Sequence, residues 1–216
     1  MWVVVEFRCT YQVRLNYKIV ERITMAQRSV KFTQGEYYHI YNRGCGRENI
    51  FRESENYSYL LRLVQKKLPQ FQVTFIAYCL MPNHYHFILR QDTDISVGNF
   101  VQNIFNSYSK AFNKRYKRSR TLFEGPFQAR HINKQEYLIH LCRYIHRNPV
   151  DAGLVKSPEE WPFSDYCNWI GAKESTYLDK DFIENIFYTA KDYETFVKEF
   201  VPPSKVKNGL NSFFLD

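Results

Sequence analysis

Residues 72–90 read QVTFIAYCLMPNHYHFILR. The stretch contains two runs rich in β-branched and aromatic residues, 72–80 and 84–90, separated by Met81, Pro82 and Asn83. Such runs are typical of strands. Proline and asparagine between them favour a turn. The stretch therefore predicts an antiparallel hairpin.

The flanking segments extend this hairpin into an α+β domain. In chain order we expect a strand at 37–42, a helix from 54 or 55, the two hairpin strands, a helix at 97–116, a strand at 127–133 and a helix at 135–147. The last helix is expected to stop before Pro149, because the residue before a proline is pushed out of helical geometry. The order β-α-β-β-α-β with an antiparallel sheet is the ferredoxin-like, split βαβ arrangement. A further C-terminal helical segment is expected near 181–200.

Three regions are distinguished along the chain. Residues 1–34 are expected to form an N-terminal extension, and Met25 is a second candidate start. Residues 35–170 are expected to form one α+β domain, and residues 171–216 a helical extension.

The composition favours a soluble protein with a polyanionic partner. The net charge is +8, the pI is about 9.2 and aromatic residues make up 18% of the chain. A basic protein gains by releasing the counterions of nucleic acid, and aromatic rings between cations suit unstacked bases. No apolar run approaches the length of about 20 residues that crosses a bilayer. We therefore expect a cytoplasmic protein without a membrane partner.

The cysteines do not indicate a metal or disulfide framework. They are odd in number and widely spaced, and they are Cys9, Cys45, Cys79, Cys142 and Cys167. Zinc sites need pairs a few residues apart. We expect reduced thiols, with Cys79 and Cys142 in the core.

Two histidines in the hairpin are candidate metal ligands. His84 and His86 are two residues apart in an expected strand, so both side chains point to the same face. Neutral imidazole binds divalent transition metals, and accepts Mg²⁺ or Mn²⁺ when oxygen ligands complete the shell. By itself the pair is also compatible with two hydrogen-bonded histidines on a sheet face. Tyr85 between them is expected to face the core on the opposite side.

The last expected helix supplies a candidate nucleophile and a third ligand. Tyr144 and Asn148 are four residues apart and share a helix face. Tyrosine can attack phosphorus when a metal polarises the phosphate, and an amide oxygen can complete the ligand set. Tyr108 is the competing tyrosine, but it lies in an apolar helical stripe and is expected in the core. Aspartate and glutamate are too scattered for a carboxylate-based nuclease.

Several motifs together resemble one family. They are MPNHYHF at 81–87, YIHRNPVDAGLV at 144–155, HIYNRG at 39–44, LFEG at 122–125 and WPFS at 161–164. In this order they resemble the HUH single-strand insertion-sequence transposases, and within them the REP-associated tyrosine transposases. The resemblance spans residues 36–169.

The resemblance implies an activity and assigns roles within it. In such proteins two histidines and an amide bind Mg²⁺ or Mn²⁺, and these roles would fall on His84, His86 and Asn148. A tyrosine, here Tyr144, would attack a DNA phosphate to form a 5′-phosphotyrosine bond and release a 3′-hydroxyl. Attack of a 3′-hydroxyl on that bond would complete strand transfer. The implied partner is single-stranded or hairpin DNA, and both a monomer and a homodimer remain open.

Basic residues near this site are candidate DNA contacts. Residues 114–120 place five cations in seven positions at the end of a helix. Cations there also complement the helix dipole. Given the net charge, we favour phosphate contacts by Lys114, Arg115, Lys117, Arg118 and Arg120. Arg43, at the end of the first strand, is the sixth candidate.

Two alternative functions are consistent with the same residues. The β-α-β-β-α-β fold also supports non-catalytic nucleic-acid-binding modules, which stack bases on exposed sheet aromatics such as Tyr38, Tyr85 or Phe87. A simple phosphodiesterase would instead use a metal-activated water and form no covalent adduct.

Overall fold

The computed structural model describes residues 30–174, 178–187 and 189–200. The predictions for an N-terminal extension and for a start at Met25 fall mainly on residues 1–29, outside the described part of the chain. The domain boundary at residue 170 stays a prediction.

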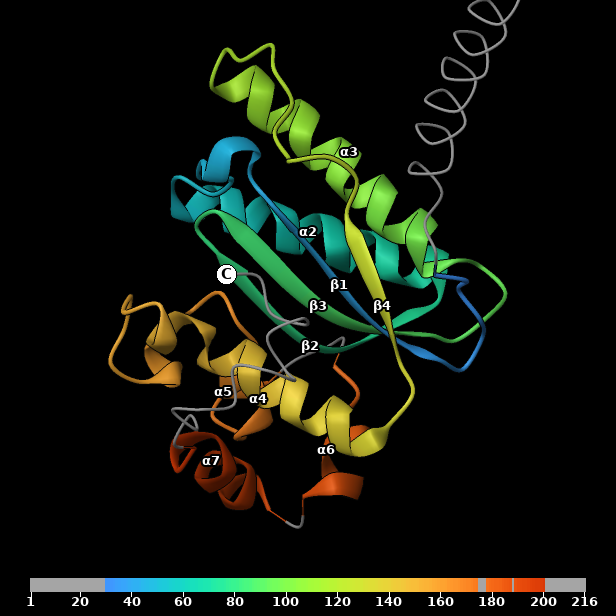
Figure 1. Ribbon diagram of the computed structural model, residues 1–216, viewed down its shortest axis with the longest axis vertical. Helices are drawn as coiled ribbons and strands as arrows, with labels where there is room; N and C mark the ends of the chain where they lie inside the picture. The colour runs from blue at the N-terminus through green and yellow to red at the C-terminus, as the bar shows by residue number, and fades with distance from the viewer. Residues whose placement is uncertain (1–29, 175–177, 188, 201–216) are drawn as a thin grey trace, which may run out of the picture. The chain divides into compact units, whose positions relative to one another are not determined.

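A four-stranded antiparallel sheet forms the centre of the fold (Figure 1). Its strands are β1 (Tyr37–Arg43), β2 (Val73–Met81), β3 (His84–Gln91) and β4 (Gln128–Ile132), in the spatial order β2-β3-β1-β4. With α2 (Ser54–Phe71) between β1 and β2 and α3 (Val97–Arg115) between β3 and β4, this is the expected split βαβ topology. The predicted fold class is confirmed.

Helices α2 and α3 cover one face of the sheet. The stripe of apolar residues expected along α3 is buried, and Phe105 of α3 stacks on Tyr85 of β3 with ring centroids 4.1 Å apart. Tyr108 is 1% exposed and its hydroxyl donates to the Ile50 carbonyl. Tyr85 and Tyr108 are therefore core residues, as expected.

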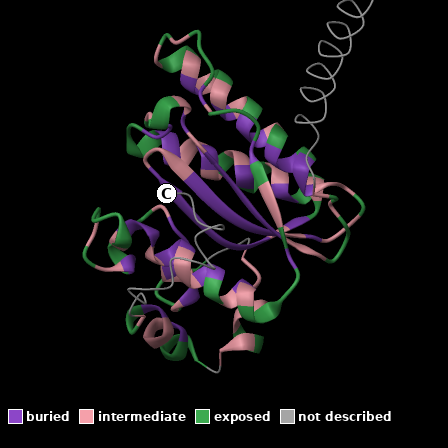
Figure 2. Ribbon diagram, viewed as in Figure 1, coloured by how far each residue is buried: buried purple, intermediate pink, exposed green. Residues whose placement is uncertain are grey.

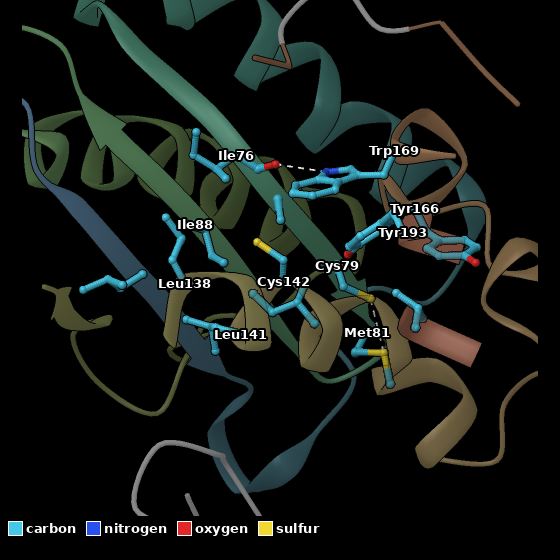
Figure 3. Packing of buried hydrophobic residues seen from close by; sticks show 14 residues of the cluster. Ile76, Cys79, Met81, Ile88, Leu138, Leu141, Cys142, Tyr166, Trp169 and Tyr193 are labelled. Atoms are coloured by element: carbon cyan, nitrogen blue, oxygen red, sulfur yellow. Dashed lines mark hydrogen bonds between the residues drawn. The ribbon is translucent and has the colours of Figure 1, made fainter. Parts of the chain in front are cut away.

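Helix α4 (Gln135–Asp151) covers the other face, where it packs against β2. Cys79 and Ile88 of the sheet meet Leu141 and Cys142 of α4 in a buried cluster (Figure 3). Cys79 and Cys142 are free thiols in the core, as predicted. Most strand residues are buried, because helices lie on both faces (Figure 2).

Helix α4 continues past the predicted end. Pro149 lies inside it, and the helix ends at Asp151, four residues beyond the expected segment 135–147. Proline lacks an N–H for the helical ladder and its ring crowds the preceding turn, yet Pro149 is buried and the last turn of α4 persists. The Asn148 carbonyl still accepts from the Ala152 N–H at 2.9 Å. As a result Asn148 keeps its helical position relative to Tyr144.

The C-terminal segment forms short helices rather than the single helix expected near 181–200. These helices are η2 (Pro158–Glu160), α5 (Tyr166–Trp169), α6 (Lys180–Ile186) and α7 (Ala190–Lys198). A further short helix, η1 (Cys45–Arg47), follows β1. Thr189 and Asp192 form a capping box that starts α7 anew. Tyr193 and Val197 of α7 join the core cluster on α4.

The segment after α4 protects the outer edge of β2. Leu80 N–H donates to the Phe163 carbonyl at 2.9 Å, and Asp165 N–H donates to the Tyr78 carbonyl at 3.3 Å. An exposed strand edge invites pairing with other chains. Residues 163–165 therefore act as a short cover for this edge. Within the described ranges, no helix is long and apolar enough to cross a membrane.

Candidate functional site

The two candidate histidines lie at the start of β3 and face α4. Pro82 and Asn83 form the turn between β2 and β3, so His84 is the first residue of its strand. His84 pairs with Arg43 of β1, and His86 pairs with Tyr41. The two imidazole rings are 5.1 Å apart and nearly perpendicular. They share a face, as the i, i+2 spacing predicts.

Tyr144 and Asn148 of α4 each lie against one of these histidines. The Tyr144 ring lies edge-on to the His86 ring, with centroids 5.7 Å apart. The Asn148 Oδ1 atom lies 3.2 Å from the His84 Nε2 atom. The fold thus brings two residues of β3 against two residues of α4, although the two pairs are about 60 positions apart in the sequence. On α4, Tyr144 and Asn148 lie roughly one helical turn apart.

His39 is a further member of the site. It lies on β1, is fully buried, and its Nε2 atom is 3.0 Å from the Nδ1 atom of His86. The two rings are stacked at 5.2 Å. The Nε2 atom of His86 is buried and has no hydrogen-bond partner among the described residues. One nitrogen of His86 is thus engaged by His39 and the other is available to a ligand.

Burial keeps the imidazoles of the site neutral. Desolvation lowers the pKa of His84, although the hydrogen bond with Asn148 opposes this shift. Desolvation, followed by repulsion from His39 and His84, holds the pKa of His86 well below its usual range. Desolvation together with Arg130 lowers the pKa of His39 to about 3. A neutral imidazole has the free lone pair that metal binding requires.

The donor set suits an ion held by mixed nitrogen and oxygen ligands. Across the described ranges, no group of three or more histidine, cysteine, aspartate or glutamate side chains is placed to hold a metal. Two imidazole nitrogens and one amide oxygen are the donors that converge here.

Arg43 lies beside this site. It pairs with His84 across the β1–β3 ladder, and both residues line a pocket of about 380 Å³. Its guanidinium forms an ion pair with Glu124. The structure therefore brings the sixth DNA-contact candidate next to a candidate metal ligand.

The basic run at 114–120 is largely engaged within the fold. Each of its arginines has a carboxylate partner, and the pairs are Arg115 with Glu53, Arg118 with Glu48 and Arg120 with Glu48. Lys114 and Lys117 are exposed. The following segment joins the end of β1, where the Cys45 N–H donates to the Leu122 carbonyl at 3.0 Å. The run thus lies at the same end of the sheet as Arg43, without contacting the histidines.

His39 is not among the site residues predicted from the sequence, because a single histidine in a strand carries no spacing signal. The signal lies in the pairing register. His39 is two residues before Tyr41, which lies opposite His86, so His39 faces the same side of the sheet. Register is a property of the sheet and not of one strand.

The fold and the site together define an α+β protein with a ferredoxin-like sheet and a cluster of histidine, tyrosine and asparagine side chains between β3 and α4. The family model described as "Transposase IS200 like" matches residues 33–148, which is more than half of the chain. The protein belongs to this family of IS200-like transposases, which confirms the resemblance seen in the sequence motifs.

Solved structures agree at the level of the fold. One is a REP-associated tyrosine transposase bound to a REP hairpin; it is 17% identical, has a TM-score of 0.59, and the match covers 72% of this chain and 98% of that one. Another, from Deinococcus radiodurans R1 and described as a transposase, is 12% identical with a TM-score of 0.40, covering 56% and 96% of the two chains. The second likeness is too low to carry an argument. No match was found among curated proteins.

Proposed function

We propose that this protein is a metal-dependent endonuclease and strand transferase that acts on single-stranded or hairpin DNA through a covalent phosphotyrosine on Tyr144. The observation that carries the proposal is the meeting of α4 with β3, which places Tyr144 against His86 and Asn148 against His84. Membership of the transposase family supports DNA as the substrate.

Mg²⁺ or Mn²⁺ fits the residues present. His84, His86 and Asn148 would hold the ion, and three protein ligands leave positions open for a phosphate. The 3.2 Å between His84 Nε2 and Asn148 Oδ1 is close to the separation of roughly 3 Å between neighbouring ligands in an octahedral shell with bonds of about 2.1 Å. The buried, unpartnered Nε2 atom of His86 supplies the third donor. When bound, the ion would polarise the scissile phosphate and neutralise charge in the transition state.

Tyr144 acts as the nucleophile in the cleavage step. Its hydroxyl oxygen forms a bond to phosphorus, and the bond from phosphorus to the 3′ oxygen breaks. The phenol proton passes through solvent to the departing 3′ oxygen. The products are a 5′-phosphotyrosine and a free 3′-hydroxyl. Attack of a 3′-hydroxyl on the phosphotyrosine reverses these bond changes and returns Tyr144, which completes strand transfer.

His39 acts on this reaction through His86. Its contact with Nδ1 of His86 leaves Nε2 of His86 as the nitrogen that faces the ion. A ligand histidine whose other nitrogen is engaged keeps a single tautomer and orientation. His39 is therefore a positioning residue.

A hairpin is the favoured form of the DNA. The solved structure with the same fold holds a REP hairpin. The exposed Lys114 and Lys117, with Arg43 beside His84, supply positive charge at one end of the sheet. Cations in this arrangement suit the phosphates of a folded strand.

The alternative of a non-catalytic base-stacking module is disfavoured by burial. Such modules need aromatic side chains exposed on the sheet. Tyr38, Tyr85 and Phe87 are all at most 1% exposed, and helices cover both faces. The alternative in which water attacks the phosphate differs from our proposal in one observable property, because it forms no covalent bond between protein and DNA.

A denaturing-gel assay for a protein–DNA adduct tests the proposal. Labelled single-stranded hairpins from the palindromic repeats of the source genome are incubated with Mn²⁺ and either the native protein or Tyr144→Phe. Tyr137→Phe is a matched control, because Tyr137 lies two turns earlier on α4 and is also partly buried. We expect an adduct in the native protein and in Tyr137→Phe, and none in Tyr144→Phe.

Two other outcomes would contradict the proposal. Cleavage without any adduct would favour attack by water. Tight binding of all hairpins without cleavage, at any Mn²⁺ concentration, would favour the binding module.

A further inference from the structure

A preformed pocket adjoins the candidate metal ligands on one side. It has a volume of about 380 Å³ and includes His84 in its lining. This is within the range of roughly 300–1,000 Å³ that small-molecule sites occupy. The rest of its lining comes from the turn after β1, the β2–β3 turn and the end of α4.

Apolar side chains in the lining of the pocket suit the face of a base. They are Met81, Pro82, Ala152 and Leu154. Met81 is buried, whereas Leu154 is 45% exposed and is the exposed large hydrophobic side chain among the described residues. Apolar side chains in a concave pocket, with a few polar groups beside them, are the usual lining of a small-molecule site. A nucleobase stacks on such surface whatever its identity.

The polar rim suits a phosphate and the edge of a base. Arg43 and Arg47 supply positive charge, and Asn49 supplies an amide group. The Asn83 amide is engaged within the protein, because its oxygen lies 2.7 Å from His84 Nδ1 and its nitrogen donates to the Arg47 carbonyl. Arg43 is held by its ion pair with Glu124. The charge of the rim is thus complementary to a nucleic-acid backbone.

Backbone hydrogen bonds hold the pocket walls in place before any ligand binds. The Gly44 N–H donates to the Asn83 carbonyl at 2.7 Å, and the Ile50 N–H donates to the Pro82 carbonyl at 2.8 Å. The Asn83 side chain donates to the Arg47 carbonyl at 3.4 Å. A preorganised site loses little conformational freedom on binding.

The pocket lies across the candidate metal site from the nucleophile. Along α4, Tyr144 contacts His86, Asn148 contacts His84 one turn later, and Ala152 lines the pocket after a further turn. In an in-line displacement at phosphorus, the leaving oxygen departs opposite the nucleophile. With a phosphate held beside Tyr144 and Asn148, the leaving oxygen would therefore point toward the pocket.

We propose that this pocket, lined by Arg43, Arg47, Asn49, Asn83 and Leu154, binds the nucleotide whose 3′ oxygen leaves during cleavage. The base lies on Leu154 and Pro82, and the phosphate on its 5′ side meets Arg47. After cleavage the same pocket retains the strand that ends in a 3′-hydroxyl, so the group needed for strand transfer stays beside the phosphotyrosine. This inference rests on the proposed function for the assignment of the leaving side.

A binding experiment tests the pocket without requiring cleavage. The probes are 5′-fluorescein-labelled single strands about ten nucleotides long, with a free 3′-hydroxyl on the last nucleotide. In one set the last nucleotide carries each of the four bases; in a second it is abasic; in a third an internal nucleotide is abasic. Affinity is measured by fluorescence anisotropy with Mn²⁺, using Tyr144→Phe as background so that no probe is cut.

Loss of the terminal base is expected to weaken binding about tenfold, a change typical of losing one stacked base. Leu154→Ala is expected to abolish this difference between probes, because the surface under the base is removed. Leu154 is exposed, so its truncation leaves the fold intact. Ile186→Ala, in a cleft formed with α6, is the matched control and is expected to keep the difference.

Other outcomes overturn the pocket or the proposed function separately. Equal weakening by terminal and internal base loss, or a terminal effect that survives in Leu154→Ala, would overturn the pocket even when the native protein forms an adduct. A terminal effect that depends on Leu154, in a protein that forms no adduct, would support the pocket as a nucleotide site and overturn the phosphotyrosine mechanism.

Discussion

At the scale of single residues, the contact between His39 and His86 decides which nitrogen faces a ligand. His86 is fully buried and has one nitrogen 3.0 Å from His39 and one without a partner in the described part of the chain. The two nitrogens of an imidazole ring are chemically distinct, because the hydrogen bond made by one sets the protonation of the other. Under the proposed function, the site would therefore depend on His39, which is not one of the proposed metal ligands.

Replacement of His39 by phenylalanine should weaken Mn²⁺ binding. His39→Phe keeps a ring stacked on His86 but removes the nitrogen that engages Nδ1. Loss of such an orienting partner costs about 10- to 100-fold in metal affinity. Calorimetric titration with Mn²⁺ measures the change, and circular dichroism checks folding. His131→Phe, which removes an imidazole paired with Glu36 away from the site, should bind as the native protein does. Native-like affinity in a folded His39→Phe protein would show that His39 does not position His86.

At the scale of secondary-structure elements, a buried polar network fixes α4 against the sheet and α7. His146 of α4 contacts the Asp165 carboxylate at 2.8 Å and the Tyr193 hydroxyl at 2.5 Å. Asp165 also accepts from the Tyr78 N–H at 2.7 Å, which ties the network to β2. All of these side chains except that of Tyr78 are fully buried. The network sets the position of the helix that carries Tyr144.

Variants that break the network should lower the free energy of unfolding, and the loss should be larger when a buried charged group is left without a partner. His146→Ala leaves the Asp165 carboxylate without its imidazole partner and should lower the free energy of unfolding by about 3–5 kcal/mol. Tyr193→Phe removes one hydrogen bond and should cost about 1–2 kcal/mol. Urea unfolding followed by circular dichroism measures both. Equal losses in the two variants would mean that the pair of His146 and Asp165 has no special role.

The turn after β1 is a second element on which the site depends. Gly44 lies so close to the rest of the turn that a Cβ atom would be 2.0 Å from the Glu48 carbonyl oxygen. Gly46, in the same turn, has a φ of 63° but no atom within 4 Å of such a Cβ. The first glycine is required by space, and the second only by backbone conformation.

Alanine at these two positions should have different consequences. Gly44→Ala must move the backbone that carries Arg43 and Arg47, so we expect reduced stability and at least tenfold weaker binding of single-stranded DNA. Gly46→Ala should cost about 1 kcal/mol of stability, the penalty of a left-handed conformation, with DNA binding nearly unchanged. Thermal unfolding and fluorescence anisotropy distinguish them. Similar DNA affinity in the two variants would contradict a role for this turn in binding.

At the scale of the whole molecule, only part of the positive charge behind the net charge of +8 is available to bind a polyanion. Arg118 is 9% exposed at its side chain, lies over the Phe112 ring and is 3.2 Å from Glu48. Its charge is used to hold the loop after α3. Lys114 and Lys117 are exposed, and no ion pair involves them within the described ranges.

The salt dependence of DNA binding should separate these two groups. Lys114→Gln and Lys117→Gln should each reduce the slope of log affinity against log salt concentration by about 1, because each removes one phosphate contact. Arg118→Gln should instead lower stability with little change in slope. Anisotropy titrations over a range of NaCl concentrations measure the slope. A loss of slope in Arg118→Gln equal to that in Lys117→Gln would place Arg118 on the DNA.

Much of the fold followed from local patterns in the sequence. The alternation of residues 84–90 and the stripe along 97–116 depend only on strand and helix periodicity, and the observed elements agree with them. The same is true of the spacing that puts Tyr144 and Asn148 on one face. The expected end of α4 was wrong, because burial of Pro149 in the core outweighs the local preference of the residue before it.

Only the tertiary structure decided which residues from different elements meet. The register between β1 and β3 places His39 on His86, and the packing of α4 on β2 brings Asn148 to His84. The ion pairs of Arg115 and Arg118 likewise depend on the path of a distant loop. The sequence by itself determined the elements and the faces that their side chains share, since these arise from backbone periodicity. Contacts between elements arise from register and packing across long stretches of chain, and no local pattern encodes them.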